Sequence, residues 1–176
     1  LDALDRRIEG GEVAGPRIVR TGFIEGKSPF NSSNGFVVDS EARAVEAVRW
    51  YAARGYIAIK IYNSITPAWV PAMVKGAHGL GLKVMGHVPA FTSADAMVAA
   101  GYDEMTHINQ LSLGWIIKPG EDTRTLFRLT ALGRLPTLDL DSAAVQSTLD
   151  AMKAKGVALD PTLGIHENLL LNRDGT

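Results

Sequence analysis

The sequence predicts an α/β protein, a partial (β/α)8 barrel of the TIM type with about five βα units. Short apolar strands alternate with helical segments of similar length along the 176 residues. Such alternation implies parallel strands joined by right-handed crossovers, as in a barrel or a doubly wound sheet. No Gly-x-Gly-x-x-Gly motif follows a predicted strand, so a dinucleotide-binding sheet lacks its usual mark. A complete barrel takes roughly 250 residues, which is why we expect only part of one.

Five strands are predicted from short runs that are rich in isoleucine, valine and other apolar residues. They cover residues 18–24, 56–62, 82–88, 103–109 and 157–163. The run 56–62 (YIAIKIY) is the clearest of them. Pro161 suits the end of the last strand, because proline cannot donate a hydrogen bond to a neighbouring strand.

Helices are predicted between these strands from capping residues, apolar stripes and terminating glycines. They cover about 40–54, 66–79, 93–100, 123–132 and 141–155. Asp39 or Ser40 can cap the first of them. In the last, Val145, Leu149 and Met152 align on one face, which we expect to be buried.

Composition and charge exclude several classes of protein. Eighteen basic and nineteen acidic side chains give a formal charge of −1, so we expect neither a nucleic acid nor a membrane as a partner. No apolar run reaches the roughly 20 residues that a membrane span needs. The absence of cysteine excludes disulfides and thiolate metal sites, and it agrees with the cytoplasmic location that we expect.

The chain reads as one incomplete barrel domain, residues 1–176, that is truncated at both ends. It begins at Leu1 and not at methionine, and residues 172–176 read as a loop. An open piece of barrel exposes two sheet edges and an apolar inner face. We therefore expect a homo-oligomer.

Lys60 stands out within the run 56–62. Side chains alternate along a strand, so the isoleucines of this run share one face, whereas Ala58, Lys60 and Tyr62 share the other. In a barrel the isoleucines would face the covering helices and Lys60 would face the interior. A buried lysine without a partner is rare, so the alternative is that Lys60 lies near the strand tip and reaches solvent. Tyr62 could contact a substrate or serve as a core aromatic residue.

The next two predicted strands repeat this pattern with histidine. His87 comes late in the run 82–88, and His107 lies near the end of 103–109, where we place it on one face with Met105 and Asn109. A single histidine of this kind is more often a hydrogen-bonded core residue than a ligand. However, adjacent parallel strands lie about 4.8 Å apart, so three nitrogen-bearing side chains near three strand tips would form one cluster. Barrel active sites lie at this end of the strands.

These runs resemble a known family in sequence. AIKIY (58–62), VMGHVP (84–89) and EMTHINQ (104–110), in that order, are similar to strands four, five and six of the amidohydrolase superfamily. The branch they resemble most is that of the Xaa-Pro dipeptidases (prolidases) and imidazolonepropionase-like proteins. GPRIVRTG (15–22) resembles the third strand of that branch and VALDPTL (157–163) the seventh. The specific part is the order and spacing, with 27 residues from Lys60 to His87 and 20 from His87 to His107.

The resemblance implies a metal centre. In the family, the lysine that matches Lys60 is carboxylated by carbon dioxide and bridges two metal ions, and the histidines that match His87 and His107 bind the second metal. That metal is usually zinc, although manganese or cobalt would also suit these ligands. A metal-bound hydroxide then attacks an amide carbonyl, which implies a hydrolase of C–N bonds in dipeptides or cyclic amides.

The family pattern is incomplete in this chain. The family also needs a His-x-His pair on the first strand and an aspartate on the eighth, and none of the four histidines is spaced as His-x-His. We therefore assign no catalytic acid or base, and we expect these 176 residues alone to be inactive. Two other functions stay open: a Schiff-base lysine aldolase that uses Lys60, and a non-catalytic barrel fragment that serves as an association module.

Overall fold

The computed structural model describes residues 2–171, and its centre is one sheet of six parallel strands. The strands lie in the order β2-β1-β3-β4-β5-β6. Their bounds are β1 Thr21–Gly26, β2 Phe36–Val38, β3 Ala58–Ile61, β4 Lys83–Gly86, β5 Glu104–Thr106 and β6 Ala158–Asp160. Within the described residues the sheet does not close. The predicted fold class, an α/β partial barrel, is confirmed, whereas the division into a single domain stays a prediction.

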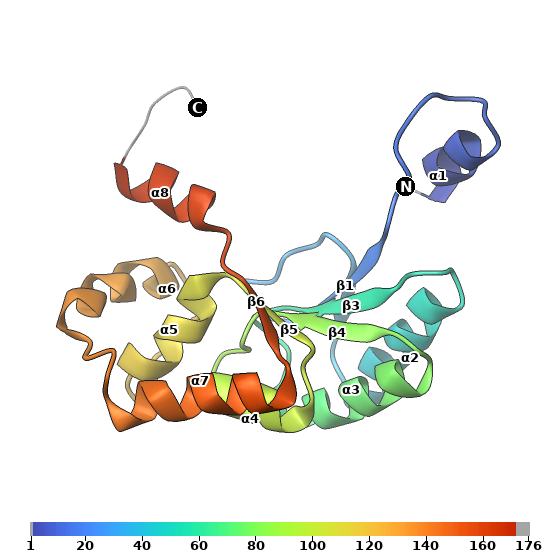
Figure 1. The fold of residues 1–176 in the computed structure, drawn as a ribbon. Coiled ribbons are helices and arrows are strands. Elements are labelled where there is room, and N and C mark those ends of the chain that lie inside the picture. Colours follow the sequence, from blue (N-terminus) through green and yellow to red (C-terminus); the bar gives the residue numbers. More distant parts are fainter. Residues whose placement is uncertain (1, 172–176) are drawn as a thin grey trace.

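Helices cover one face of this sheet, as Figure 1 shows for α2, α3, α4 and α7. The α-helices are α1 Asp2–Glu9, α2 Glu41–Ala52, α3 Val70–Gly79, α4 Ala94–Ala100, α5 Ile108–Ile116, α6 Phe127–Thr130, α7 Ala143–Lys155 and α8 Leu163–Leu171. Two 3-10 helices, η1 Pro67–Trp69 and η2 Ala131–Thr137, precede α3 and follow α6. Helix α8 lies on the other side of the sheet from α7 (Figure 1). No helix in residues 2–171 combines the length and apolarity that a membrane span requires.

The main core lies between the sheet and the covering helices. Ile24, Ile59 and Met105 are fully buried there, on three different strands. The alternation predicted for β3 holds for Ile59 and Ile61, which are both fully buried. It fails for Ile57, which precedes the strand and is 52% exposed.

Capping residues fix the predicted helix starts. The Ser40 side chain accepts a hydrogen bond from the Arg43 N–H at the start of α2. Ser93 caps α4 in the same way, through the N–H of Ala96. Each cap satisfies a backbone donor that has no partner within its own helix. In α7, Val145 and Met152 are buried as predicted, but Leu149 is 41% exposed, so its predicted burial is wrong.

Three elements were not predicted from the sequence. Strand β2 has only three residues and is held by parallel pairing with β1, where Ile24 lies opposite Phe36. Helix α5 begins at Ile108, so the strand predicted for 103–109 ends at Thr106 instead. Helix α8 begins at Leu163, the last residue of the strand predicted for 157–163.

Candidate metal centre

The strand register places the inner-face side chains in rows across the sheet. Phe23, Lys60, Met85, Glu104 and Ala158 lie in register on five neighbouring strands. A second row lies two residues further along each strand, because side chains two apart share a face. It contains Tyr62, His87, Thr106 and Asp160. The second row stands at the carboxyl ends of the strands.

Lys60 is half-buried on the inner face of β3. Burial lowers the pKa of its amine, and the negative charges of Asp160 and Glu104 only partly offset that effect. The neutral amine is therefore more accessible than in a solvated lysine. The structure thus places Lys60 inside, as the alternation of the strand predicts.

His87 comes directly after β4 and is 3% exposed. Its neighbour Gly86 has a φ of +136°, and a Cβ at this position would lie 2.1 Å from the carbonyl oxygen of Ile61. Only glycine allows the end of β4 to approach β3 so closely. The N–H of His87 then donates to the same Ile61 carbonyl at 2.9 Å.

The His87 ring is held on one side and free on the other. Its Nδ1 contacts the side-chain oxygen of Asn63. Its Nε2 is buried and has no hydrogen-bond partner among the described residues. Burial, followed by the positive charges of His107, Lys60 and Arg128, lowers the pKa of His87 to about 2. The ring is therefore neutral, and a neutral imidazole is the form that binds metals.

The His107 ring lies beside that of His87, but the backbone conformation that puts it there differs from the predicted strand. Met105 faces the helix-side core and is fully buried, so strict alternation would put His107 on that side too. The strand ends at Thr106, however, and His107 has a φ of +73°. This left-handed backbone redirects the side chain, and the His107 ring lies 4.8 Å from the His87 ring at 80°. The face predicted for His107, shared with Met105 and Asn109, is wrong, although its place beside His87 agrees with the predicted cluster.

The His107 ring is also held at Nδ1, 2.6 Å from the hydroxyl oxygen of Thr162. Its backbone N–H donates to the carbonyl of Asp160 at 2.6 Å, which ties the end of β5 to β6. Burial, followed by the charge of Lys60, lowers the pKa of His107 to about 4, and Asp160 opposes this shift. Lys60 thus acts electrostatically on both histidines.

Tyr62 packs inside this cluster. Its ring centroid lies 3.9 Å from that of His87 and 4.8 Å from that of Phe23. This packing supports the orientation of the His87 ring. The substrate contact predicted for Tyr62 stays a prediction.

The cluster suits a metal ion in its chemistry. Within residues 2–171, no three His, Cys, Asp or Glu side chains gather as a ligand set. The rings of His87 and His107 lie side by side, and Lys60 is close enough for its charge to lower the pKa of both. In the second row, Thr106 adds a buried hydroxyl that also lacks a partner among the described residues. Unsatisfied buried polar atoms are costly, and a bound ion or its water would satisfy them.

Sequence reasoning missed residues that hold or surround the ligands. Asn63 and Thr162 contact the two imidazole rings, and Thr106 lies between His87 and Asp160 in the second row. Arg128, next to the start of α6, is close enough for its charge to lower the pKa of both histidines. Asn63 and Thr162 could have been noticed as polar residues beyond strand ends, but nothing local in the sequence marks Arg128.

Glu25 is a fully buried carboxylate on β1. Glu25 accepts hydrogen bonds from the N–H groups of Ser64 at 2.7 Å, Gly26 at 3.0 Å and Ser32 at 3.4 Å. Burial raises the pKa of Glu25, and these three donors oppose the shift without cancelling it. Glu25 therefore joins the segment after β1 to the loop after β3.

Comparison with known proteins identifies the fold. No protein-family model and no curated protein sequence matches the chain. Among solved structures, a Xaa-Pro dipeptidase with methionine bound in its active site superposes with a TM-score of 0.62 at 20% identity, over 97% of this chain and 41% of that one. Ochratoxinase from A. niger gives 0.64 at 16% identity, with the same coverage of 97% and 41%. The bottromycin amidohydrolase gives 0.55 at 20% identity, over 75% and 28%.

These matches confirm, at the level of the fold, the resemblance to amidohydrolases that the sequence motifs predict. The chain has the fold of part of such a protein. It spans about 41% of the length of the first two structures.

Proposed function

We propose that this chain provides part of the metal centre of a hydrolase that acts on amide C–N bonds. The observation that carries the proposal is the Nε2 atom of His87, which is buried with no partner in residues 2–171, in a ring 4.8 Å from that of His107. Two imidazoles whose Nδ1 atoms are both engaged leave two Nε2 atoms for one ion. Zinc accepts such nitrogen ligands at about 2.0–2.1 Å.

Lys60 would complete the ligand set after carboxylation. Its lowered pKa favours the neutral amine. This amine can attack carbon dioxide, forming an N–C bond and releasing one proton to give a carbamate anion. The product replaces a cation next to two histidines with oxygen ligands of opposite charge. Zinc or another divalent metal would be held by this carbamate together with His87 and His107.

A metal bound there would supply Lewis acidity toward an amide carbonyl and toward the attacking water. The chain's own residues hold the ligands in place, through Thr162 at His107 and through Tyr62 and Asn63 at His87. Tyr62 would contact the substrate from the same position. The similarity in fold to a dipeptidase and to an amidohydrolase supports an amide substrate, such as a dipeptide or a cyclic amide.

The activity of the isolated chain is a separate matter. None of its four histidines forms a His-x-His pair. We propose that the 176 residues bind metal but do not turn over substrate without further ligands.

A second function rests on the same lysine. A half-buried Lys60 with a lowered pKa also suits a Schiff-base nucleophile, as in lysine-dependent aldolases. The buried Nε2 of His87, which none of the described residues satisfies, has no role in that chemistry and favours the hydrolase. Borohydride trapping of a carbonyl compound on Lys60 would reverse this preference.

Metal uptake tests the proposal. We compare three proteins after dialysis against zinc with and without bicarbonate: the wild-type chain, Lys60→Met and Lys75→Met. Lys75→Met is the control, because Lys75 is an exposed lysine on α3. We expect stoichiometric zinc in the wild type and in the control, increased by bicarbonate, and a loss of the bicarbonate effect in Lys60→Met. A wild-type chain that retains no zinc under either condition would refute the metal centre and leave the association module.

A further inference from the structure

Asn63, which follows Tyr62 after β3, uses both ends of its side-chain amide and is 2% exposed. The amide oxygen contacts Nδ1 of His87. The amide nitrogen donates a hydrogen bond to the backbone carbonyl of Thr123 at 3.1 Å. Asn63 therefore connects a candidate metal ligand to a loop that lies sixty residues further along the chain.

The Thr123 contact fixes which way the Asn63 amide points. A backbone carbonyl only accepts hydrogen bonds, so the amide NH2 must face Thr123 and the amide oxygen must face His87. That oxygen also only accepts, so Nδ1 of His87 must carry the ring proton. In the neutral ring the lone pair is then on Nε2, the buried nitrogen for which the described part of the chain offers no partner. This is the tautomer that presents Nε2 to a metal ion.

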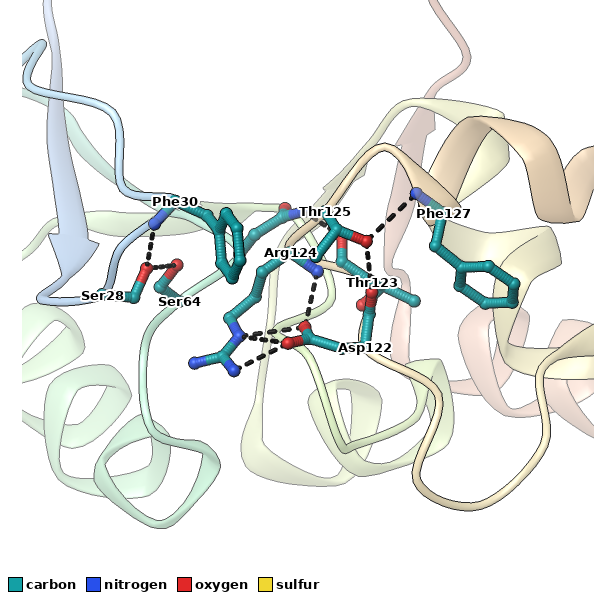
Figure 2. Close-up of polar contacts among 9 residues, drawn as sticks. Ser28, Phe30, Ser64, Asp122, Thr123, Arg124, Thr125 and Phe127 are labelled. Carbon is teal, nitrogen blue, oxygen red and sulfur yellow. Dashed lines mark hydrogen bonds and ion pairs between the residues drawn. The ribbon is translucent and has the colours of Figure 1, made fainter.

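The loop that offers the Thr123 carbonyl is held by its own side chains. The Arg124 guanidinium donates to both carboxylate oxygens of Asp122, at 2.9 Å and 2.7 Å. The Thr125 hydroxyl donates to the backbone carbonyl of Asp122 at 3.1 Å. Figure 2 shows Arg124 reaching back to Asp122 beneath the ring of Phe30. The segment 122–125 therefore has a defined shape, although it belongs to no helix or strand.

Aromatic side chains fix the same loop against the rim of the site. The Arg124 guanidinium carbon lies 5.1 Å from the ring centroid of Phe91 and 5.9 Å from that of Phe30. A cavity of about 160 Å³ is lined by Arg124 together with Asn63, Ser64 and Phe91. Contacts of a guanidinium with aromatic rings are favourable. The loop therefore rests on residues that follow three different strands.

From these contacts we infer that Asn63 is a positioning residue, which holds His87 as the Nδ1-protonated tautomer while the 122–125 loop holds the Asn63 amide. The Nδ1-protonated tautomer and the hydrogen bond from Asn63 to Thr123 are both features of the metal-free chain. The consequence for zinc rests on the proposed function. Partners of metal-bound histidines typically change metal affinity about 10- to 100-fold when removed.

Three variants separate this role from a general loss of packing. Asn63→Leu has a similar volume but neither accepts from Nδ1 nor donates to Thr123. Asn63→Asp keeps an acceptor for Nδ1, loses the donor to Thr123 and adds a negative charge. Tyr102→Phe is the matched control, because its buried hydroxyl donates its hydrogen bond to the backbone carbonyl of His87, at 3.1 Å, and not to a ring nitrogen.

The first measurement is the His87 tautomer in the metal-free chain, from the 15N shifts of its ring nitrogens. We expect protonation at Nδ1 in the wild type, Asn63→Asp and Tyr102→Phe, and a mixture of tautomers in Asn63→Leu. An unchanged tautomer in folded Asn63→Leu would overturn the inference. So would a wild-type ring protonated at Nε2.

The second measurement is the zinc dissociation constant of the same four proteins. We expect it to rise about 10- to 100-fold in Asn63→Leu and to be largely restored in Asn63→Asp. Equal affinities of Asn63→Leu and Tyr102→Phe would refute the positioning role. If the wild type binds no zinc, the proposed function fails, and the tautomer measurement still decides whether Asn63 sets the ring.

Discussion

The Nδ1 atom of His107 lies 2.6 Å from the hydroxyl oxygen of Thr162, which follows β6. Thr162 has a φ of +47°, and its N–H donates to the Asp160 carboxylate at 3.2 Å, so its position is fixed by the end of β6. The two imidazole rings are thus oriented from opposite sides, His87 by Asn63 and His107 by Thr162.

Replacing Thr162 with valine keeps the shape of the side chain and removes the oxygen that holds His107. We expect Thr162→Val to weaken zinc binding about 10-fold, because the ring loses its outer partner. The control is Thr137→Val, in which the lost hydroxyl donates only to the Arg134 carbonyl in η2. Zinc titrations measure the affinity of both variants for zinc. Equal affinities would show that Thr162 does not orient His107.

Gly86 is predicted to tolerate no other residue without a loss of stability. A Cβ there would meet the Ile61 carbonyl oxygen at 2.1 Å, and the φ of +136° is strained for any other residue. We expect Gly86→Ala to reduce the free energy of unfolding by more than about 2 kcal/mol. Gly79→Ala is the control, since nothing lies within 4 Å of the added Cβ. Urea unfolding of the two variants tests this, and similar stabilities would contradict the close approach of β4 to β3.

Stability of the metal-free chain should fall in acid. The pKa values of His87 and His107 are lowered from 6.5 to about 2 and about 4 in the folded chain. Between these values and 6.5 the unfolded chain binds more protons, so the free energy of unfolding falls as the pH falls through that range. Thermal melts from pH 7.5 to pH 4 of the wild type and His87→Leu measure it. The wild type should show the steeper dependence, and identical slopes would mean that His87 is not buried as a neutral ring.

The strands and helix caps were predictable because their causes are local. Ile59 and Ile61 alternate with Lys60 within four residues, and β3 forms where this pattern predicts it. Ser40 and Ser93 cap helices through N–H groups three residues ahead. Patterns of this length can be read from the sequence directly.

The errors and omissions come from contacts between distant segments. The three residues of β2 become a strand only by pairing with β1. His107 was placed on the wrong face because its positive φ is set where β5 meets β6, through the Asp160 carbonyl. Asn63 and Thr123 are sixty residues apart, so their hydrogen bond has no local signal. The closeness of the His87 and His107 rings could be predicted, whereas the residues that orient these rings could not.

Self-association should follow from the two edges of the sheet. Within residues 2–171, β2 and β6 each pair with one strand only, which leaves their outer backbone groups available. Apolar side chains lie beside these edges, with Val37 40% exposed in β2 and Leu163 62% exposed after β6. We expect a dimer or larger assembly in size-exclusion chromatography with light scattering. A monomer at all concentrations would contradict this.

The central claim is that His87 and His107 bind one metal ion. It is tested most directly by X-ray absorption at the zinc edge, on the chain carrying His78→Gln and His166→Gln, so that only these two histidines remain. We predict a zinc ion with two imidazole ligands at about 2.0–2.1 Å and oxygen in its other positions. Zinc with no imidazole ligand, or with one, would contradict the claim.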